Sequence, residues 1–93
     1  RTVAVPPPAQ DVSMQLDLRG MRAHEVPELL DRYINDAYLA NLSDVRIIHG
    51  KGTGTLRKIV RDALSAHPLV TSLAAGVDGE GGEGVTTAKL ERR

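Results

Sequence analysis

The chain has 93 residues, 41% of them apolar, and its 12 lysines and arginines balance 12 acidic residues to a formal net charge of zero. That length allows one small domain, and the neutral balance argues against a histone-like nucleic-acid binder. With no cysteine, disulfides, zinc ribbons and thiol nucleophiles are excluded; since no apolar run approaches the ~20 residues of a membrane span, we expect a cytoplasmic protein.

The first twelve residues differ from the rest of the chain. Residues 1–12 hold Pro6, Pro7 and Pro8 among small residues with no periodicity, a composition typical of an extended linker. The chain opens on Arg1 rather than on Met. We therefore expect residues 1–12 to be a proline-rich linker that joins a domain, residues 13–93, to the remainder of a larger protein.

A strand and a helix are expected next. From Met14 to Arg19 apolar and polar residues alternate, which predicts a strand that turns Met14, Leu16 and Leu18 toward a core and ends at Gly20. A helix is predicted from about His24 to Asn41, with Pro27 tolerable only in its first turn. Its apolar stripe consists of Val26, Leu29, Leu30, Tyr33, Ile34 and Ala37.

The second predicted strand, Val45 to His49, runs into the glycine loop, residues 50–54, before a helix from Thr55 to Ala66. Such a junction directs backbone N–H groups and the positive end of the helix dipole into one concavity, which suits a phosphate. The loop is no Walker A motif, because Lys51 stands between two glycines, and a dinucleotide fingerprint needs a glycine where Thr55 stands.

Two more strands complete the predicted fold, Leu69 to Gly76 and Val85 to Leu90, with a glycine-rich turn between them. The order βαβαββ predicts an α/β two-layer sandwich, a four-stranded mixed sheet with two helices on one face. The first two strands, joined by a helical crossover, should be parallel. Their ends, at Asp17 to Gly20 and His49 to Gly52, are then expected to meet at one edge of the sheet.

Three blocks of this chain resemble the signature blocks of the Smr (small MutS-related) domain, in order and at about the usual distances, and the likeness covers Met14 to Leu90. They are Leu16-Asp17-Leu18-Arg19-Gly20, His49-Gly50-Lys51-Gly52-Thr53-Gly54 and Gly81-Gly82-Glu83-Gly84-Val85-Thr86. The family often has His where this chain has Arg19. The Arg form with a proline linker resembles the C-terminal domain of the MutS-family homologue that suppresses homologous recombination.

The resemblance implies an endonuclease that nicks or cuts DNA with little sequence preference, favours branched recombination intermediates, and forms part of a larger MutS-like ATPase protein. Related proteins act on RNA in stalled or collided ribosomes. A non-catalytic nucleic-acid or ribosome-binding module is therefore the alternative. An oligomerisation domain has only the exposed sheet face in its favour.

Hydrolysis of a phosphodiester needs an activated nucleophile, a proton for the leaving oxygen and positive charge around phosphorus. The candidate catalytic residues are Asp17, as a base or the group that orients one, Arg19, as a fixed cation, and His49, as an acid or base or only a phosphate ligand. Candidate nucleic-acid-binding residues come from the glycine loop and from a run of cations without acids that ends at Arg61. They are Lys51, Gly52, Thr53, Gly54, Arg57, Lys58 and Arg61.

No tightly bound metal is expected, and a requirement for a divalent ion in solution stays open. A two-metal nuclease needs clustered carboxylates, and Asp17 has none near it in sequence. Asp78, Glu80 and Glu83 do not follow the EF-hand pattern. Because Tyr33 belongs to the apolar stripe and Tyr38 to its margin, bases have no aromatic platform to stack on. Binding is expected through phosphates and shape rather than through base identity.

Overall fold

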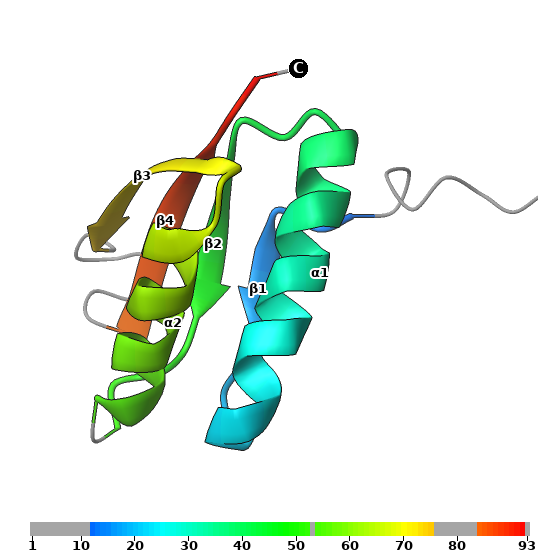
Figure 1. Ribbon diagram of the computed structural model, residues 1–93. Coiled ribbons are helices and arrows are strands. Elements are labelled where there is room, and N and C mark those ends of the chain that lie inside the picture. Colours follow the sequence, from blue (N-terminus) through cyan, green and yellow to red (C-terminus); the bar gives the residue numbers. More distant parts are fainter. Residues whose placement is uncertain (1–11, 53, 76–83, 93) are drawn as a thin grey trace, which may run out of the picture.

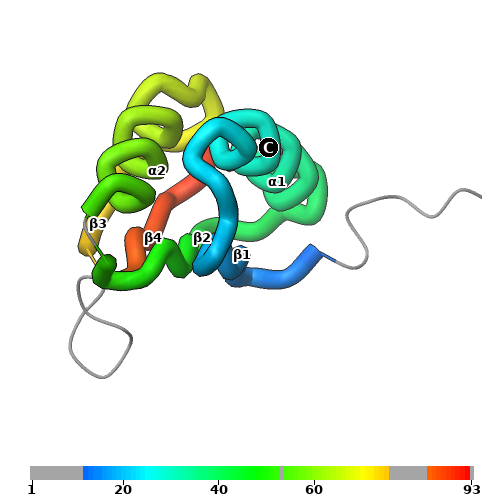
Figure 2. Tube along the Cα trace, turned by 90° about the horizontal axis from the view of Figure 1, so that it is seen from below, coloured from blue at the N-terminus to red at the C-terminus, as the bar shows by residue number. Residues whose placement is uncertain are grey.

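A computed structural model describes residues 12–52, 54–75 and 84–92. It is a two-layer α/β sandwich (Figure 1). In chain order the elements are β1 (Gln15–Asp17), the 3-10 turn η2 (Ala23–Glu25), α1 (Val26–Leu39), β2 (Asp44–Ile48), α2 (Thr55–Ala66), β3 (Val70–Ala75) and β4 (Val85–Leu90). Both helices cover the same face of the sheet, as the end-on view in Figure 2 shows. The predicted fold class is confirmed.

The sheet has the order β1-β2-β4-β3, so the last strand of the chain lies inside the sheet. β1 runs parallel to β2, with Asp17 opposite Ile48, as the helical crossover predicts. β4 is antiparallel to both β2 and β3. The C-terminal ends of β1 and β2 therefore lie beside the start of β4, at the lower edge of Figure 1.

The first helix begins where its sequence allows. Glu25 accepts a hydrogen bond from the backbone N–H of Arg22 at 3.3 Å, which closes the entry turn, and Pro27 lies in the first turn of α1, where no helical N–H is lost. The chain leaves the helix at Ala40, and Asn41 has a φ of 63°, a left-handed conformation that asparagine tolerates. The α-helix is thus shorter at both ends than the predicted span of His24 to Asn41.

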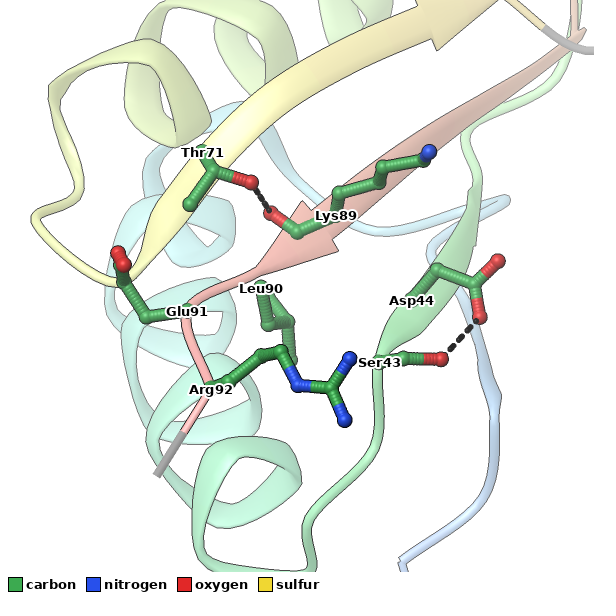
Figure 3. A pocket seen from close by; sticks show the side chains of 7 residues that line it. All are labelled: Ser43, Asp44, Thr71, Lys89, Leu90, Glu91 and Arg92. Carbon is green, nitrogen blue, oxygen red and sulfur yellow. Dashed lines mark hydrogen bonds between the residues drawn. The ribbon is translucent and has the colours of Figure 1, made fainter.

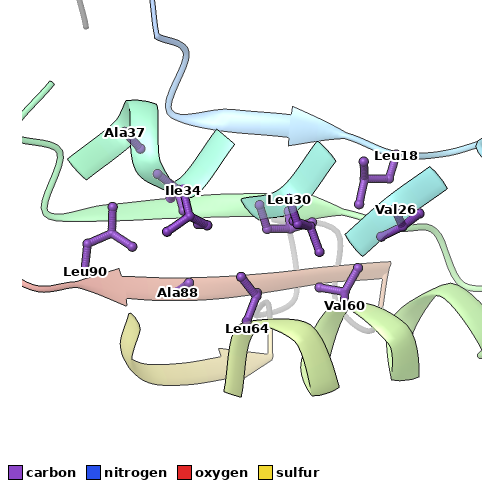
Figure 4. Packing of buried hydrophobic residues seen from close by; sticks show 11 residues of the cluster. Leu18, Val26, Leu30, Ile34, Ala37, Val60, Leu64, Ala88 and Leu90 are labelled. Atoms are coloured by element: carbon purple, nitrogen blue, oxygen red, sulfur yellow. The ribbon is translucent and has the colours of Figure 1, made fainter. Parts of the chain in front are cut away.

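The core lies between the helices and the sheet and is aliphatic, because the chain has no Phe or Trp. Figure 4 shows side chains of α1 and α2 meeting those of β4 and the end of β1. The buried cluster consists of Leu18, Val26, Leu30, Ile34, Ala37, Val45, Ile47, Val60, Leu64, Ala88 and Leu90. The predicted core stripe of α1 is largely confirmed, with Leu29 and Tyr33 only partly buried at its margin.

The first strand departs from its prediction. β1 pairs with β2 over only three residues, and Met14, expected in the core, is 57% exposed. An edge strand has a neighbour on one side only, and Met14 precedes the part of the chain that pairs regularly. Leu18, four residues later, is fully buried and carries the core contact of this segment.

Among the helices of the described residues, none is long and apolar enough to cross a membrane.

Candidate functional site

The candidate site is built at the edge where β1 and β2 end and β4 begins. Asp17 is the last residue of β1, and His49 follows β2 directly. Gly54 precedes the first turn of α2 and takes a φ of 87°, which glycine adopts without strain. The predicted meeting of the first and second signature blocks is confirmed by the pairing of Asp17 with Ile48.

Asp17 and Arg19 form a bidentate ion pair on this edge. The Arg19 guanidinium donates from Nη2 to Oδ2 at 2.7 Å and from Nε to Oδ1 at 3.0 Å, and the Arg19 backbone N–H donates to Oδ1 at 3.0 Å. Both side chains face solvent, with 65% of Arg19 and 45% of Asp17 exposed. The side-chain hydrogen bond from Arg19, followed by the backbone one, lowers the pKa of Asp17 to about 2. The carboxylate is therefore charged throughout the physiological range.

Gly50 connects the three signature blocks. Its φ is 82°, and a β-carbon at this position would lie 3.4 Å from Cγ of Arg19. On the other strand, a β-carbon on Gly84 would lie 3.3 Å from the carbonyl carbon of Gly50 and 3.4 Å from its Cα. The stem of Arg19 and the backbone of Gly84 thus both pack against Gly50. The start of the glycine loop has little room to shift relative to β1 or β4.

His49 is buried rather than presented to solvent, with 4% of the residue exposed. Its Nδ1 lies 3.0 Å from the carbonyl oxygen of Gly50, and its Nε2 lies 2.9 Å from Oγ1 of Thr86. Both ring nitrogens are therefore occupied by the protein. Because the ring turns toward β4, the role predicted for His49 as an acid, base or phosphate ligand stays a prediction, and it requires the ring to exchange one of these two partners for the substrate.

Two residues of the glycine loop, Lys51 and Gly52, are open to solvent. No atom lies within 4 Å of where a β-carbon on Gly52 or Gly54 would stand. Thr53, a predicted ligand, lies outside the described residues. Because the residue before α2 is glycine, it offers no side chain to cap the first turn. This stretch has the space and the dipole direction that an anion needs.

The basic face of α2, namely Arg57, Lys58 and Arg61, continues from the loop. With Gly54 and Asp62 these residues line a surface pocket of about 330 Å³. The predicted run of cations ends at Arg61, and the next residue, Asp62, is an acid. Its carboxylate lies 3.2 Å from Lys58 Nζ. Both partners of this ion pair are largely exposed, so it is weak and yields readily to a stronger anion. Arg57 and Arg61 are the better candidates for phosphate contacts.

No metal centre is evident at this edge. Within the described residues, histidines and carboxylates form no group of three or more that could hold an ion. Asp78, Glu80 and Glu83 lie outside the described residues.

A second pocket, of about 570 Å³, lies at the other end of β2 (Figure 3). Its walls carry two cations, Lys89 and Arg92, together with two carboxylates, Asp44 and Glu91. This mixture provides no net positive charge for a phosphate. Despite its larger volume, we do not assign the candidate site to it.

Residue-by-residue reasoning on the sequence missed Gly84 and Thr86. Both contact the second block directly, since the Gly84 carbonyl accepts the backbone N–H groups of His49 and Gly50, each at 3.0 Å, and Thr86 meets the His49 ring. The signal in the sequence that could have identified them is the third signature block, which contains both residues. That block supported the family resemblance, but no role was assigned to its residues.

Comparison with known proteins shows which family the chain resembles. The sequence pattern of the Smr domain matches residues 16–91. Endonuclease MutS2 of Clostridium beijerinckii is 51% identical over 81 residues, which make up 87% of this chain and 10% of that protein. Endonuclease MutS2 of Symbiobacterium thermophilum is 52% identical over 82 residues, 88% of this chain and 10% of that protein. The chain thus spans about a tenth of the length of these curated relatives.

Two crystal structures share the fold. The Smr domain of Thermus thermophilus MutS2 matches with a TM-score of 0.80 at 42% identity, over 83% of this chain and 96% of that chain. YdaL, a stand-alone small MutS-related protein from Escherichia coli, matches with a TM-score of 0.79 at 25% identity, over 94% of this chain and 67% of that chain.

Proposed function

The chain belongs to the Smr domain family, and from this premise we propose that it is an endonuclease domain that hydrolyses a phosphodiester bond of DNA. The observation that carries the proposal is the exposed Asp17 carboxylate beside the glycine loop. A carboxylate repels a polyanion, so a domain that only binds phosphates would do better without it. Little sequence preference is expected because the cations near the loop would contact phosphates rather than base edges. The preference for branched DNA rests on the family resemblance alone.

The proposed reaction is an attack of water on phosphorus. Arg19, Lys51 and the loop amides hold the phosphate and offset the charge that develops on its oxygens. Asp17 orients the attacking water and accepts its proton as the new P–O bond forms. The bond to the leaving oxygen breaks, and because the His49 ring faces inward, that oxygen takes its proton from solvent.

Arg19 must change partners for Asp17 to act in this way. While Arg19 holds both carboxylate oxygens, the pKa of Asp17 is about 2, which makes it a weak base near neutral pH. A bound phosphate competes for the same guanidinium, because arginine binds phosphate and carboxylate with the same planar fork. Transfer of Arg19 to the phosphate frees the carboxylate at the moment when a base is needed.

The test compares the purified chain with its Asp17→Asn variant on supercoiled plasmid, at several protein concentrations, with and without a chelator. The substitution removes the charge and keeps the shape. We expect nicking to fall by the ~10² to 10⁴ typical of a general base, while affinity for DNA holds or rises. Asp44→Asn, at the far end of β2, is the matched control and should nick at the wild-type rate. Wild-type nicking by Asp17→Asn contradicts the proposal.

One observation favours the alternative, a non-catalytic module that binds nucleic acid or a ribosome. The Asp17 carboxylate is fully occupied by Arg19, and a carboxylate in that state can serve simply to orient Arg19 toward phosphates. In that case neither protein nicks plasmid at any concentration, with or without a divalent ion. Asp17→Asn would then weaken binding instead of preserving it.

A further inference from the structure

A buried contact joins β4 to the glycine loop through the ring of His49. The Gly50 carbonyl can only accept a hydrogen bond, so Nδ1 of His49, 3.0 Å away, carries the proton. In the neutral ring Nε2 then has a lone pair, and the Thr86 hydroxyl, 2.9 Å away, donates to it. The Gly50 carbonyl thereby sets the tautomer of the ring, and the Thr86 hydroxyl holds the opposite side of the ring in place by donating to Nε2.

Backbone contacts from Gly84, the residue before β4, hold the same part of the loop. The Gly84 carbonyl accepts the N–H groups of both His49 and Gly50 at 3.0 Å. Gly84 lies so close to Gly50 that a β-carbon would press on the Gly50 backbone at 3.3 Å and on the Lys51 side chain at 3.4 Å. Gly84 is therefore both the hydrogen-bond acceptor and the packing surface for the beginning of the loop.

The direction in which the loop leaves β2 depends on these contacts. Gly50 is held at a φ of 82°, and Lys51 follows it immediately. If Gly50 turned differently, its carbonyl and the buried ring would both lose partners, and an unsatisfied buried group is costly. The same turn sets the position of the Lys51 stem against Gly84.

We propose that Thr86 and Gly84 are positioning residues for the phosphate-holding loop: Thr86, acting through His49, and Gly84, through its backbone, fix the Gly50 turn so that Lys51 faces the bound phosphate. The inference rests on the proposed function for its phosphate and on the contacts above for its geometry. It also explains why a histidine that is only 4% exposed stands at the head of the loop.

The test uses the 93-residue chain with Thr86→Val, which keeps the shape and removes the hydroxyl, and with Thr86→Ser, which restores it. The matched control is Thr87→Val, the same change one residue along β4, where the side chain turns to the opposite face of the sheet. Nitrogen NMR of the His49 ring reports which nitrogen carries the proton. The amide signals of Gly50 and Gly52 report the loop, and a short duplex DNA reports binding.

We expect wild-type chain to show the proton on Nδ1. Thr86→Val should alter both the ring and the loop amide signals and weaken duplex binding by roughly 3- to 10-fold, the cost of one neutral hydrogen bond. If the plasmid is cut, KM should rise more than kcat falls. Thr86→Ser should restore these properties, and Thr87→Val should leave them unchanged.

The proposal is overturned if Thr86→Val leaves the ring and loop signals as in wild type. It is also overturned if the signals change while duplex affinity does not, or if Thr86→Ser behaves like Thr86→Val, since the methyl group and not the hydroxyl would then matter. If Thr86→Val changes the loop signals and weakens DNA binding as expected, but the wild-type chain does not cut DNA, the endonuclease proposal alone is overturned. A chain that cuts normally with Thr86→Val overturns this inference alone.

Discussion

The Asp17 carboxylate is the group on which the proposed chemistry depends, and its lowered pKa also leads to a prediction about stability. Its pKa in the folded chain is about 2, below the ordinary 3.8, because Arg19 donates to it from both side chain and backbone. A carboxylate with a lowered pKa stabilises the fold at pH values above the ordinary pKa. That stabilisation is lost as the pH falls through the folded value.

We therefore expect the difference in melting temperature between wild-type chain and Asp17→Asn to be constant above about pH 4 and to disappear between pH 4 and pH 2. Because both partners are exposed, added salt should shrink the difference at neutral pH. Thermal unfolding from pH 7 to pH 2, at low and high salt, measures it. A difference that persists unchanged at pH 2 shows that the substitution disturbs packing and that the charge is irrelevant.

The two helices carry opposite charges, since α2 is basic and α1 is acidic. α2 presents Arg57, Lys58 and Arg61 beside the glycine loop, with one acid, Asp62, close to Lys58. The first helix and its entry turn carry four acids against Arg32, which lies 3.9 Å from Glu28. These acids are Glu25, Glu28, Asp31 and Asp36. A polyanion should therefore follow α2 and avoid α1, which limits how the domain can sit on a duplex.

Replacing Arg57 and Arg61 together by Ala should weaken duplex binding. It should also make the plot of log affinity against log salt shallower, by about 0.9 for each phosphate that the domain no longer neutralises. Fluorescence anisotropy at four or more salt concentrations gives the slope. The matched comparison uses two single variants: Arg61→Ala removes one positive charge from α2, and Arg32→Ala removes the same charge from α1. Equal slopes for these two single variants would mean that the basic face of α2 is solvated surface and not a binding face.

At the scale of the whole molecule, the first described residues already contact the folded core. Val12 packs against the core, and the carbonyl of Ser13 accepts a hydrogen bond from the hydroxyl of Tyr33 on α1. Burial raises the pKa of that hydroxyl to about 12, so it stays protonated and able to donate. Within the described part of the chain, contacts with the core therefore begin at residues 12 and 13.

Deleting residues 1–11 should leave the melting temperature unchanged, whereas deleting residues 1–13 should lower it by roughly 4 to 8 °C for each kcal/mol of burial and hydrogen bonding that is removed. Differential scanning calorimetry on the two truncations and the full chain compares them directly. If the shorter deletion already lowers the melting temperature, the segment predicted to be a linker belongs to the folded domain, and the boundary placed after residue 12 is wrong.

The helices, the strands and the class of fold follow from local patterns. The alternation of apolar and polar residues predicted β1, and helical periodicity predicted the apolar stripe of α1. The β-branched residues predicted β2. The glycines marked where the chain turns, because a φ above zero, as at Gly50 and Gly54, strongly favours glycine. A helical crossover has one favoured hand and makes its strands parallel, so the meeting of Asp17 with the end of β2 could also be predicted.

The partner of the His49 ring and the placing of β4 between β2 and β3 could not be predicted in this way. Alternation could assign a face to each strand residue but could not identify the strand that would lie beside it. His49 shares the buried face of Val45 and Ile47, but the hydroxyl that its ring meets on that face belongs to Thr86, 37 residues later. A side chain's partners across a sheet are set by the order of the strands, which long-range packing decides and no local pattern records.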